Sequence, residues 1–558
     1  MTATAKRMQQ ISLAREPSGL VDTCDAGYAG GIATRLRVLL VGIAGTSADF
    51  LLSLPVLRSY LRQDAAVEAR CDIRILHHKY ILPAALEADC DAIFGEIAAF
   101  RPDLVGFSTY VWNIGAVTRL ARAVRERLPG TRIALGGPEI AANDIVAGRF
   151  DGFPLDFAIV GEGEIPLQRL LLQCLSGGAD GLEDIPRLCY RRNGALSRSG
   201  LSLNDAGLIV DLAAAPSAYL NGDVPAAVLD RPGTRANVET QRGCSFRCAY
   251  CLYHAHYPSI RYRSAAIVLD ELQSIYGHGI EHCRITDANF LSSPRHAAAI
   301  LGGMIERGIR MSLFFEAIPS FVDDSIAALI GQYGALSPKN EVMVGIGLQS
   351  IHPESLRAIR RNLPIRHFDG AYERLLRANA VVKTDVILGL PHESLESYIK
   401  LLEYVAEKVV RGSNWLSLAL LRILPGTELE ATAQREDLIL DKRDSEHFVY
   451  ATPTLPRADM LTCLQLSTVA FRLLHAPGAA SQPVRERYFQ VKSRVSPNHA
   501  RMLFHFVRFF FATLENSGAD FVKEDYPNAE HYWYFDVHRD LPDAVLLGEF
   551  DRIEREGL

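Results

Sequence analysis

The sequence predicts an α/β protein with a doubly wound, Rossmann-like sheet, then a partial TIM barrel, then a mainly helical C-terminal domain. Two stretches predict the sheets, because in each of them apolar runs of strand length alternate with amphipathic helical patterns. Such alternation is typical of βαβ units and parallel sheets. A third observation predicts the last domain: the alternation ends near residue 430, and helical periodicity replaces it.

The first alternation fills residues 36–176. The predicted strands are Val38–Ile43, Ile73–Leu76, Leu104–Ser108, Ile133–Gly136 and Phe157–Val160. The clearest helical patterns between them are Ala116–Leu128 and Pro166–Leu175. A doubly wound sheet of this kind binds its ligands at the carboxyl ends of its strands. We expect residues 1–35 to form a lead segment, and residues 177–235, which are rich in Gly, Asp, Ala and Pro, to form a connector with a few short strands.

The second alternation fills residues 236–430. The predicted strands are Asn237–Glu239, Cys283–Thr286, Met311–Glu316, Val342–Leu348, Thr384–Leu388 and Leu416–Leu421. These strand–helix units suit an incomplete TIM barrel, with its active site at the carboxyl ends of the strands. In the expected helical domain, residues 431–558, the aromatic clusters Met502–Phe511 and Tyr532–Phe535 are most simply explained as core packing.

Composition excludes several classes of protein. The chain has 558 residues, of which 48% are hydrophobic and 22% are charged, which excludes a disordered or collagen-like chain. A net charge of −6 gives no reason to expect a nucleic-acid partner. No apolar stretch approaches the roughly 20 residues of a membrane span, and Met1–Glu16 lacks the apolar region of a secretory signal. We therefore expect a cytoplasmic protein with no membrane partner.

Three of the ten cysteines are packed closely together. Cys244, Cys248 and Cys251 have C-x3-C-x2-C spacing and follow a predicted strand. Three thiolates at this spacing suit a [4Fe–4S] cluster with one iron left open for a further ligand. A zinc site with His254 as fourth ligand, or purely structural cysteines, remain the alternatives. The other seven cysteines are expected to be inert packing residues.

This cysteine motif, with the aromatic Tyr250 before the last cysteine, resembles the signature of radical S-adenosylmethionine (SAM) enzymes. Four further segments resemble strands of that family's barrel, in the family's order: Ile285–Phe290, Val344–Ser350, Asp385–Glu393 and Leu424–Leu429. The resemblance implies that the open iron chelates SAM and that an electron from the cluster cleaves its sulfonium. It also implies a set of residues that contact or support SAM, namely Tyr250, Asp287, Asn289, Gln349, Ser350 and Ile387. Glu316 is the expected catalytic group beside SAM or the substrate.

The strand ends of the first sheet carry small residues, which leave room for a bulky planar ligand. The segments Gly106–Tyr110, Gly136–Glu139 and Phe157–Glu164 resemble those of the cobalamin-binding domains that precede many radical SAM enzymes. The residues expected to bind cobalamin are Ser108, Thr109, Tyr110, Trp112, Asn113, Gly136, Gly137, Glu139, Gly161, Glu162 and Gly163. A plain nucleotide-binding sheet is the alternative, although neither a G-x-G-x-x-G nor a P-loop motif is present.

The chain departs from many cobalamin proteins in one respect. Their D-x-H-x-x-G motif supplies a histidine to cobalt, whereas Gly42–Phe50 contains no histidine and Asp536–Leu541 lacks the glycine. We therefore expect cobalamin with its dimethylbenzimidazole tail displaced and no histidine as lower ligand. We expect the group below cobalt to lie on the loops after the second and third strands. Arg74 is the predicted catalytic cation there; the further candidates are Arg70, His77, His78, Tyr110, Trp112 and Asn113.

The two resemblances together imply a cobalamin-dependent radical SAM methyltransferase. Such an enzyme moves a methyl group from SAM through methylcobalamin to a carbon of a natural-product precursor. The chain most resembles members that methylate C2 of the tryptophan indole by polar transfer in antibiotic biosynthesis. The implied partners are a small-molecule substrate, with L-tryptophan as the candidate, and an external electron donor of flavodoxin or ferredoxin type. Radical methylation of another scaffold, a cobalamin radical SAM enzyme that does not methylate, and a non-enzymatic carrier remain open.

Overall fold

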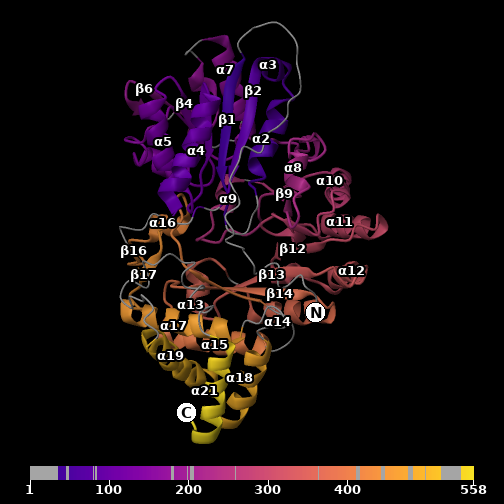
Figure 1. The fold of residues 1–558 in the computed structure, drawn as a ribbon, viewed down its shortest axis with the longest axis vertical. Coiled ribbons are helices and arrows are strands. Elements are labelled where there is room, and N and C mark those ends of the chain that lie inside the picture. Colours follow the sequence, from indigo (N-terminus) through magenta and orange to yellow (C-terminus); the bar gives the residue numbers. More distant parts are fainter. Residues whose placement is uncertain are drawn as a thin grey trace.

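The structure is a computed structural model. It describes residues 35–45, 50–79, 81, 85–177, 181–197, 199–201, 207–257, 259–361, 363–409, 415–440, 447–474, 482–496, 498–516 and 542–558. The expected lead up to residue 34, the cluster Tyr532–Phe535 and the segment Asp536–Leu541 lie outside these residues. Along the longest axis, the N-terminal sheet, the central barrel and the C-terminal helices follow one another from top to bottom (Figure 1).

The N-terminal sheet is parallel over five strands. They are β1 (Leu36–Ile43), β2 (Cys71–His78), β3 (Leu104–Ser108), β4 (Arg132–Gly136) and β5 (Phe157–Ile159), in the order β2-β1-β3-β4-β5. Two antiparallel strands, β6 (Leu188–Arg192) and β7 (Ala195–Leu196), extend the sheet beyond β5. The sheet therefore reaches into the stretch expected to be a connector. The order reverses between β1 and β3, and doubly wound sheets bind ligands at this switch point.

Helices cover both faces of this sheet. One core joins alternate residues of β1 to α2 (Ser53–Leu61), α3 (Ala65–Arg70) and α7 (Glu164–Ser176). The other core joins the intervening residues to α4 (Leu86–Phe100), α5 (Ile114–Arg127) and α6 (Ala142–Val146). Burial on both faces explains why the strands are continuous apolar runs in the sequence.

The central domain is an open parallel barrel, as the sequence predicted. Its strands, in spatial order, are β15 (Trp415–Leu420), β14 (Val381–Leu388), β13 (Val342–Gln349), β12 (Ser312–Ala317), β11 (His282–Ile285) and β8 (Arg235–Val238). The helices between them are α10 (Ala265–Gly277), α11 (Pro294–Glu306), α12 (Asp324–Gly334), α13 (Pro353–Ala358), α14 (Ile365–Arg377) and α15 (Leu395–Val409). Short elements at the carboxyl ends of the strands are β9 (Gln241–Arg242), α9 (Tyr253–His256), β10 (Arg261–Tyr262) and α16 (Glu428–Thr432).

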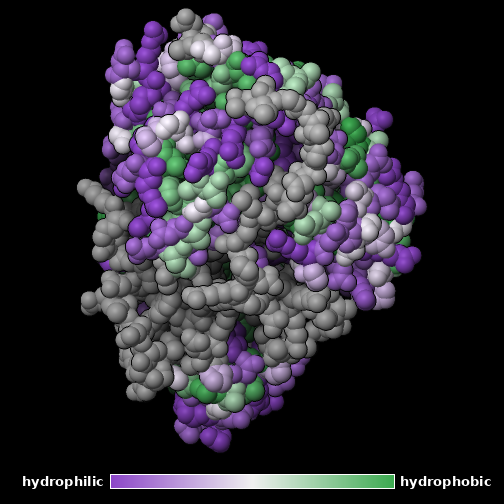
Figure 2. All heavy atoms as spheres, turned by 45° about the horizontal axis from the view of Figure 1, so that its top comes forward, coloured by the Kyte–Doolittle hydropathy of each residue, from purple (hydrophilic) through white to green (hydrophobic). Residues whose placement is uncertain are grey.

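The C-terminal region is mainly helical. Its elements are β16 (Ile439–Leu440), β17 (Val449–Ala451), α17 (Arg457–Leu474), α18 (Gln482–Val495), α19 (His499–Asn516) and α21 (Asp543–Glu556). Met502, Leu503 and Phe506 of α19 are buried, and the ring of Phe506 lies 4.7 Å from that of Phe550. This part of the aromatic cluster is core, as predicted. On the face drawn in Figure 2, apolar side chains are scattered among hydrophilic ones. None of the helices in the described residues has the length and apolar character that a membrane crossing requires.

Candidate functional site

The cysteine loop begins at a turn that requires glycine. Gly243 has a φ of +102°, and a Cβ there would lie 2.5 Å from the carbonyl oxygen of Ser259. Cys244 follows this turn directly and is partly exposed, as is Cys251, whereas Cys248 is buried. The amide of Cys251 donates to the carbonyl of Cys248 at 3.0 Å. The three predicted ligands are therefore carried by one tight loop.

Asp287 and Asn289 hold the chain that enters this loop. The carboxylate of Asp287 accepts hydrogen bonds from the amides of Thr240 and Gln241, at 2.8 and 3.2 Å, and from the Thr240 hydroxyl. Burial raises the pKa of Asp287 to about 7 in spite of these donors. The side-chain oxygen of Asn289 accepts a hydrogen bond from the amide of Ile318, and its backbone carbonyl accepts one from the side chain of Gln241. Both predicted SAM-site residues thus support the cysteine loop.

Arg361 is a functional candidate that the sequence did not reveal. Its guanidinium is buried and donates to Cys248 Sγ at 3.5 Å and to the carbonyl of Gly347 at 3.2 Å. In the described residues, its Nε has no hydrogen-bond partner. A buried cation with a spare donor beside the cysteines suits a carboxylate ligand. In the sequence, Arg360 and Arg361 look like an ordinary exposed basic pair, and only Arg360 is exposed.

Tyr250 lies within the same group. Burial raises the pKa of its phenol, which is close to both Arg361 and Cys248. Burial also raises the pKa of Cys244 and that of Cys251, the latter to about 11. A bound metal centre would therefore have to supply the positive charge that makes these thiols thiolate ligands.

Charged side chains from β12 and β14 meet beside β13, and Glu316 stands near the carboxyl end of β12, whereas Lys383 and Asp385 lie in the first half and the middle of β14. The ammonium of Lys383 lies 3.1 Å from Glu316 Oε1 and 2.5 Å from Asp385 Oδ1. Burial, and after it the charge of Asp385, raises the pKa of Glu316. Gly345 leaves room for this carboxylate, since a Cβ there would lie 2.2 Å from Glu316 Oε2. Glu316, the predicted catalytic group, therefore occupies a position that its neighbours define.

The ends of β13 and β14 carry the remaining predicted SAM-site residues. Gln349 has a φ of +65°, and the register between the two strands shifts there. The hydroxyl of Ser350 donates to Glu393 at 3.4 Å, and the amide of Gly389 donates to the same carboxyl at 3.2 Å. Burial raises the pKa of Glu393 to about 8, so this carboxyl is protonated near neutral pH. Ile387 is buried one residue before β14 ends.

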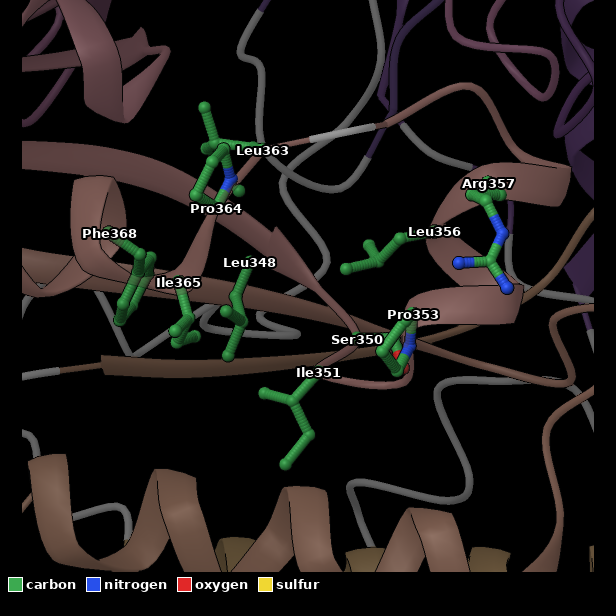
Figure 3. Close-up of a pocket in the computed structure, with 11 residues that line it drawn as sticks. Leu348, Ser350, Ile351, Pro353, Leu356, Arg357, Leu363, Pro364, Ile365 and Phe368 are labelled. Carbon is green, nitrogen blue, oxygen red and sulfur yellow. The ribbon is translucent and has the colours of Figure 1, made fainter.

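A pocket of about 440 Å³ opens beside the end of β13 (Figure 3). Gly347 and Ser350 belong to its wall, so it adjoins the predicted SAM site. Most of the other lining residues are apolar, including Leu348, Ile351 and Phe368. An apolar pocket with few polar groups suits a planar ring.

In the N-terminal domain, the switch point between β1 and β3 is bridged by Asn113. Its side-chain amide donates to the carbonyls of Ile43 at 3.1 Å and Ser108 at 3.0 Å. The ring of Trp112 stacks on that of Tyr110, with centroids 4.4 Å apart. All four predicted cobalamin-site residues named here therefore meet at the crevice where ligands bind in such sheets.

Small residues line the neighbouring strand ends. The amide and hydroxyl of Thr109 donate to the carbonyl of Gly136 at 2.7 and 2.8 Å. Gly137 has a φ of +107°, and a Cβ there would lie 2.5 Å from the carbonyl oxygen of Thr109. Gly161 has a φ of +83°, and Gly163 packs closely against α2. Small residues at this edge fit a bulky ligand that approaches the backbone closely.

The two carboxylates predicted to bind cobalamin form ion pairs with arginines. Glu139 Oε1 accepts from Arg149 at 2.5 Å. Glu162 is ion-paired with Arg242 at 3.0 Å and also with Arg261. Both carboxylates are buried, and the paired arginines compensate their charge. The pairs tie neighbouring segments of the chain together.

Arg74 lies apart from the cobalamin-site residues. We expected it on the loop after the second strand, but it lies within β2, exposed, 3.4 Å from Asp72 and over the ring of Phe100. The strand is longer than predicted and ends at His78, so His77 and His78 are also strand residues. Burial lowers the pKa of His77 to about 4, and its neutral ring packs edge-on to Phe50.

The carboxyl edges of the two parallel sheets face each other. Gly426, on the loop after β15, lies against Ala141, on the loop after β4. Arg242, after β8, pairs with Glu162, after β5. Any ligands held at the two edges would share the space between them.

The chemistry of the donor set fits an iron–sulfur cluster. Among the described residues, no group of three or more His, Cys, Asp or Glu side chains is placed to hold a metal ion. A [4Fe–4S] cluster separates its thiolates by its own width, and three free cysteines on one loop suit it. Of the other seven cysteines, all but Cys24 are described; they are free thiols, and all of these except Cys174 are buried.

Two family models match the chain. The Radical SAM superfamily matches residues 238–405, and the B12 binding domain matches residues 56–171. The chain thus contains a region that matches the radical SAM superfamily and, before it, a region that matches the B12 binding domain. These two matches agree with the resemblances seen in the cysteine motif and in the strand ends.

A curated relative is named as a cobalamin-dependent methyltransferase. TokK, a cobalamin-dependent radical SAM methyltransferase of Streptomyces tokunonensis, is 28% identical over 359 residues, which make up 62% of this chain and 49% of TokK. The chain spans about half the length of the curated relatives it matches.

Two solved structures share the fold. OxsB, a cobalamin-dependent SAM radical enzyme solved with aqua-cobalamin and SAM, has a TM-score of 0.62 at 14% identity, covering 94% of this chain and 81% of OxsB. TsrM, a radical SAM methyltransferase from Kitasatospora setae solved with tryptophan and a SAM analog, has a TM-score of 0.57 at 19% identity, covering 73% of this chain and 77% of TsrM. These likenesses confirm the predicted fold class.

Proposed function

We propose that this protein is a cobalamin-dependent radical SAM methyltransferase that transfers a methyl group from SAM to a carbon of a small natural-product precursor. The observation that carries the proposal is the facing of the two carboxyl edges, joined by Arg242 and Glu162. A methyl carrier at one edge and a methyl donor at the other would lie within reach of one substrate.

The cofactors and the protein have separate tasks. When bound, the [4Fe–4S] cluster would supply an electron and a chelating iron for SAM, and cobalamin would carry the methyl group. Cys244, Cys248 and Cys251 would hold the cluster. Arg361 offers its buried guanidinium to the carboxylate of SAM, and Glu316 is held by Lys383 where it can accept hydrogen bonds from SAM or take a proton from the substrate.

Cobalamin is proposed to bind at the switch point with its tail displaced and no histidine below cobalt. The residues lining that crevice, Tyr110, Trp112 and Asn113, offer no imidazole. Protein loaded with cob(II)alamin should therefore give an electron paramagnetic resonance (EPR) spectrum without nitrogen hyperfine splitting. Splitting that disappears in His77→Ala or His78→Ala would assign a histidine ligand and overturn this point.

The proposed acceptor is C2 of the tryptophan indole, by polar transfer. Its support is the fold shared with TsrM, whose structure contains tryptophan as substrate, and an apolar pocket that suits a planar ring. We also propose that an external flavodoxin or ferredoxin supplies the electrons. The proposed setting is a biosynthetic pathway that modifies tryptophan before its incorporation into an antibiotic.

The test is product analysis after anaerobic reconstitution with iron, sulfide and cobalamin. The protein is incubated with methyl-deuterated SAM, a reductant and L-tryptophan, and the products are quantified by mass spectrometry. Deuteromethyl-tryptophan with S-adenosylhomocysteine, and without stoichiometric 5′-deoxyadenosine, supports polar C2 methylation. Stoichiometric 5′-deoxyadenosine together with a methylated product favours radical methylation.

A second candidate function is a cobalamin radical SAM reaction that transfers no methyl group. The observation in its favour is the fold shared with OxsB over 94% of this chain. Under the same conditions it would release 5′-deoxyadenosine and leave no label on any product. That result across a panel of indoles and other scaffolds would overturn the methyltransferase proposal.

A further inference from the structure

A buried cluster of ion pairs joins the two cofactor domains at the root of the cysteine loop. Arg242 stands two residues before Cys244. Its guanidinium contacts Glu162 at 3.0 Å, Glu164 at 2.7 Å and Glu239 at 3.0 Å. The first two carboxylates belong to the turn after β5 and the start of α7 in the N-terminal domain, and the third follows β8 in the barrel. One side chain thus touches both domains.

Arg261 completes this cluster from the neighbouring strand. β9 and β10 pair antiparallel, with Arg242 opposite Arg261. Arg261 pairs with Glu162 and donates to the carbonyl of Ile209 at 2.5 Å, and the amide of Ile209 donates back to Glu162 at 3.2 Å. The Glu162 carboxylate is therefore held from several sides.

The burial of these charges indicates a positional role. The side chains of Arg242 and Glu162 are only 7% and 2% exposed. Buried ion pairs seldom stabilise a fold more than apolar residues of the same size would, because their desolvation cost is high. The rigid, planar fork of arginine instead fixes direction and distance between its partners. Here the fixed distance is that from the Gly161–Gly163 turn to the root of the cysteine loop.

We propose that Arg242 is a positioning residue that couples the two cofactor sites: when cobalamin occupies the strand ends beside the Gly161–Gly163 turn, Glu162 and Arg242 hold the cysteine loop and protect its cluster. The proposal rests on the proposed binding of both cofactors. It predicts that cobalamin, bound in one domain, changes the behaviour of the cluster in the other, and that this effect passes through the Arg242 guanidinium.

The test measures release of cluster iron to a chelator, with and without cobalamin, in the anaerobically reconstituted full chain. In the wild type, cobalamin should slow the release. In Arg242→Lys, which keeps the charge but loses the fork, release should be about tenfold faster, as is usual when a supporting partner of a metal ligand is lost. The rate of iron release from Arg242→Lys should also no longer change when cobalamin is added. The EPR spectrum of the reduced cluster should change, while the bound cobalamin content stays at the wild-type level.

Arg58→Lys is the matched control. Arg58 forms a buried pair with Asp223 at 2.9 Å that also joins the N-terminal domain to the segment before the barrel. This variant should keep the wild-type release rate and the wild-type response to cobalamin. Arg242→Lys with wild-type iron release, or Arg58→Lys with the same acceleration, would overturn the coupling. Failure of the proposed function is distinguishable, because the wild type itself would then retain no cobalamin or no cluster.

Discussion

The guanidinium of Arg361 donates to the sulfur of Cys248 at 3.5 Å, across 113 residues of sequence. The same group donates to the carbonyl of Gly347, at the end of β13. A buried cation thus links the cysteine loop to the strand that bears Gln349 and Ser350. This link makes the cysteines, the barrel mouth and the predicted SAM site one connected structure.

Arg361→Met should weaken SAM binding by about tenfold or more, since hydrogen bonds to a charged group contribute about 1.5–3 kcal/mol. The reason is the loss of a buried guanidinium beside Cys248 whose Nε is left to donate to a carboxylate. Equilibrium dialysis with reconstituted protein measures the affinity, and iron content shows that the cluster remains. Arg360→Lys, at the exposed neighbour that pairs with Glu428, is the control and should bind SAM as the wild type does. Equal affinity in both variants would remove Arg361 from the site.

Cys248→Ala should abolish the brown chromophore and its iron, because two thiolates do not retain a [4Fe–4S] cluster. Bound cobalamin should persist, since its proposed site lies on the other sheet. Iron and cobalt analysis of the purified protein measures the content of cluster and of cobalamin. Cys174→Ala, at a partly exposed cysteine of the N-terminal domain, should keep the full iron content. A Cys248→Ala protein that still carries wild-type iron would contradict the ligand assignment.

Glu393→Gln should change how stability depends on pH. Burial raises the pKa of Glu393 from 4.5 to about 8. Between these values the unfolded chain releases this proton and the folded chain keeps it. The carboxyl therefore lowers the free energy of unfolding as pH rises, by up to about 1.4 kcal/mol per pH unit. Glutamine, which resembles the protonated carboxyl, avoids this loss.

Urea unfolding at pH 5 and pH 8 measures this effect. Glu393→Gln should be more stable relative to the wild type at pH 8 than at pH 5. Glu396→Gln, at a neighbouring exposed residue paired with Lys400, should leave the difference between the two pH values unchanged. Parallel pH dependence in the wild type and Glu393→Gln would show that Glu393 is already ionised in the folded protein.

Gly345→Ala should displace Glu316, because the new Cβ would lie 2.2 Å from Glu316 Oε2. Overpacking of this kind lowers the free energy of unfolding by about 1–3 kcal/mol. Because Glu316 is displaced, the affinity for SAM should fall as well. Gly302→Ala is the matched control: Gly302 lies in α11 with open space around it, and alanine there should stabilise by about 0.5–1 kcal/mol. Thermal unfolding measures the stability of both variants.

The contact between Gly345 and Glu316 can be isolated by a double variant. In a Glu316→Ala background the carboxylate is gone, so Gly345→Ala should cost little further stability. The same cost in both backgrounds would place the strain elsewhere on β13.

The sequence predicted the central parts of the strands well, because burial on both faces gives continuous apolar runs. β3 has the predicted bounds, Leu104–Ser108. β2 is longer than predicted, since it ends in His77 and His78, whose burial a hydropathy pattern does not show. β6 and β7 lie at the sheet edge, where charged residues such as Arg191 and Arg192 interrupt the apolar pattern.

The candidate site was predictable only in part. The cysteine motif and the glycines at strand ends are local in sequence, so they could be recognised there. Glu162 pairs with Arg242 and Arg261 because two domains dock, and nothing near Glu162 in the sequence indicates these partners. The role of Arg361 could not be predicted for the same reason, because its contact with the sulfur of Cys248 joins two segments that are far apart in the sequence.

The facing of the two carboxyl edges is tested most directly by the magnetic interaction between the cofactors. We would measure EPR spectra of the reconstituted full chain with cob(II)alamin and the reduced [4Fe–4S] cluster both present. Because dipolar coupling falls steeply with distance, facing edges predict broadened signals and faster relaxation of the cobalt spin than in protein lacking the cluster. Two independent, unbroadened spectra from protein shown to hold both cofactors would contradict a shared site between the sheets.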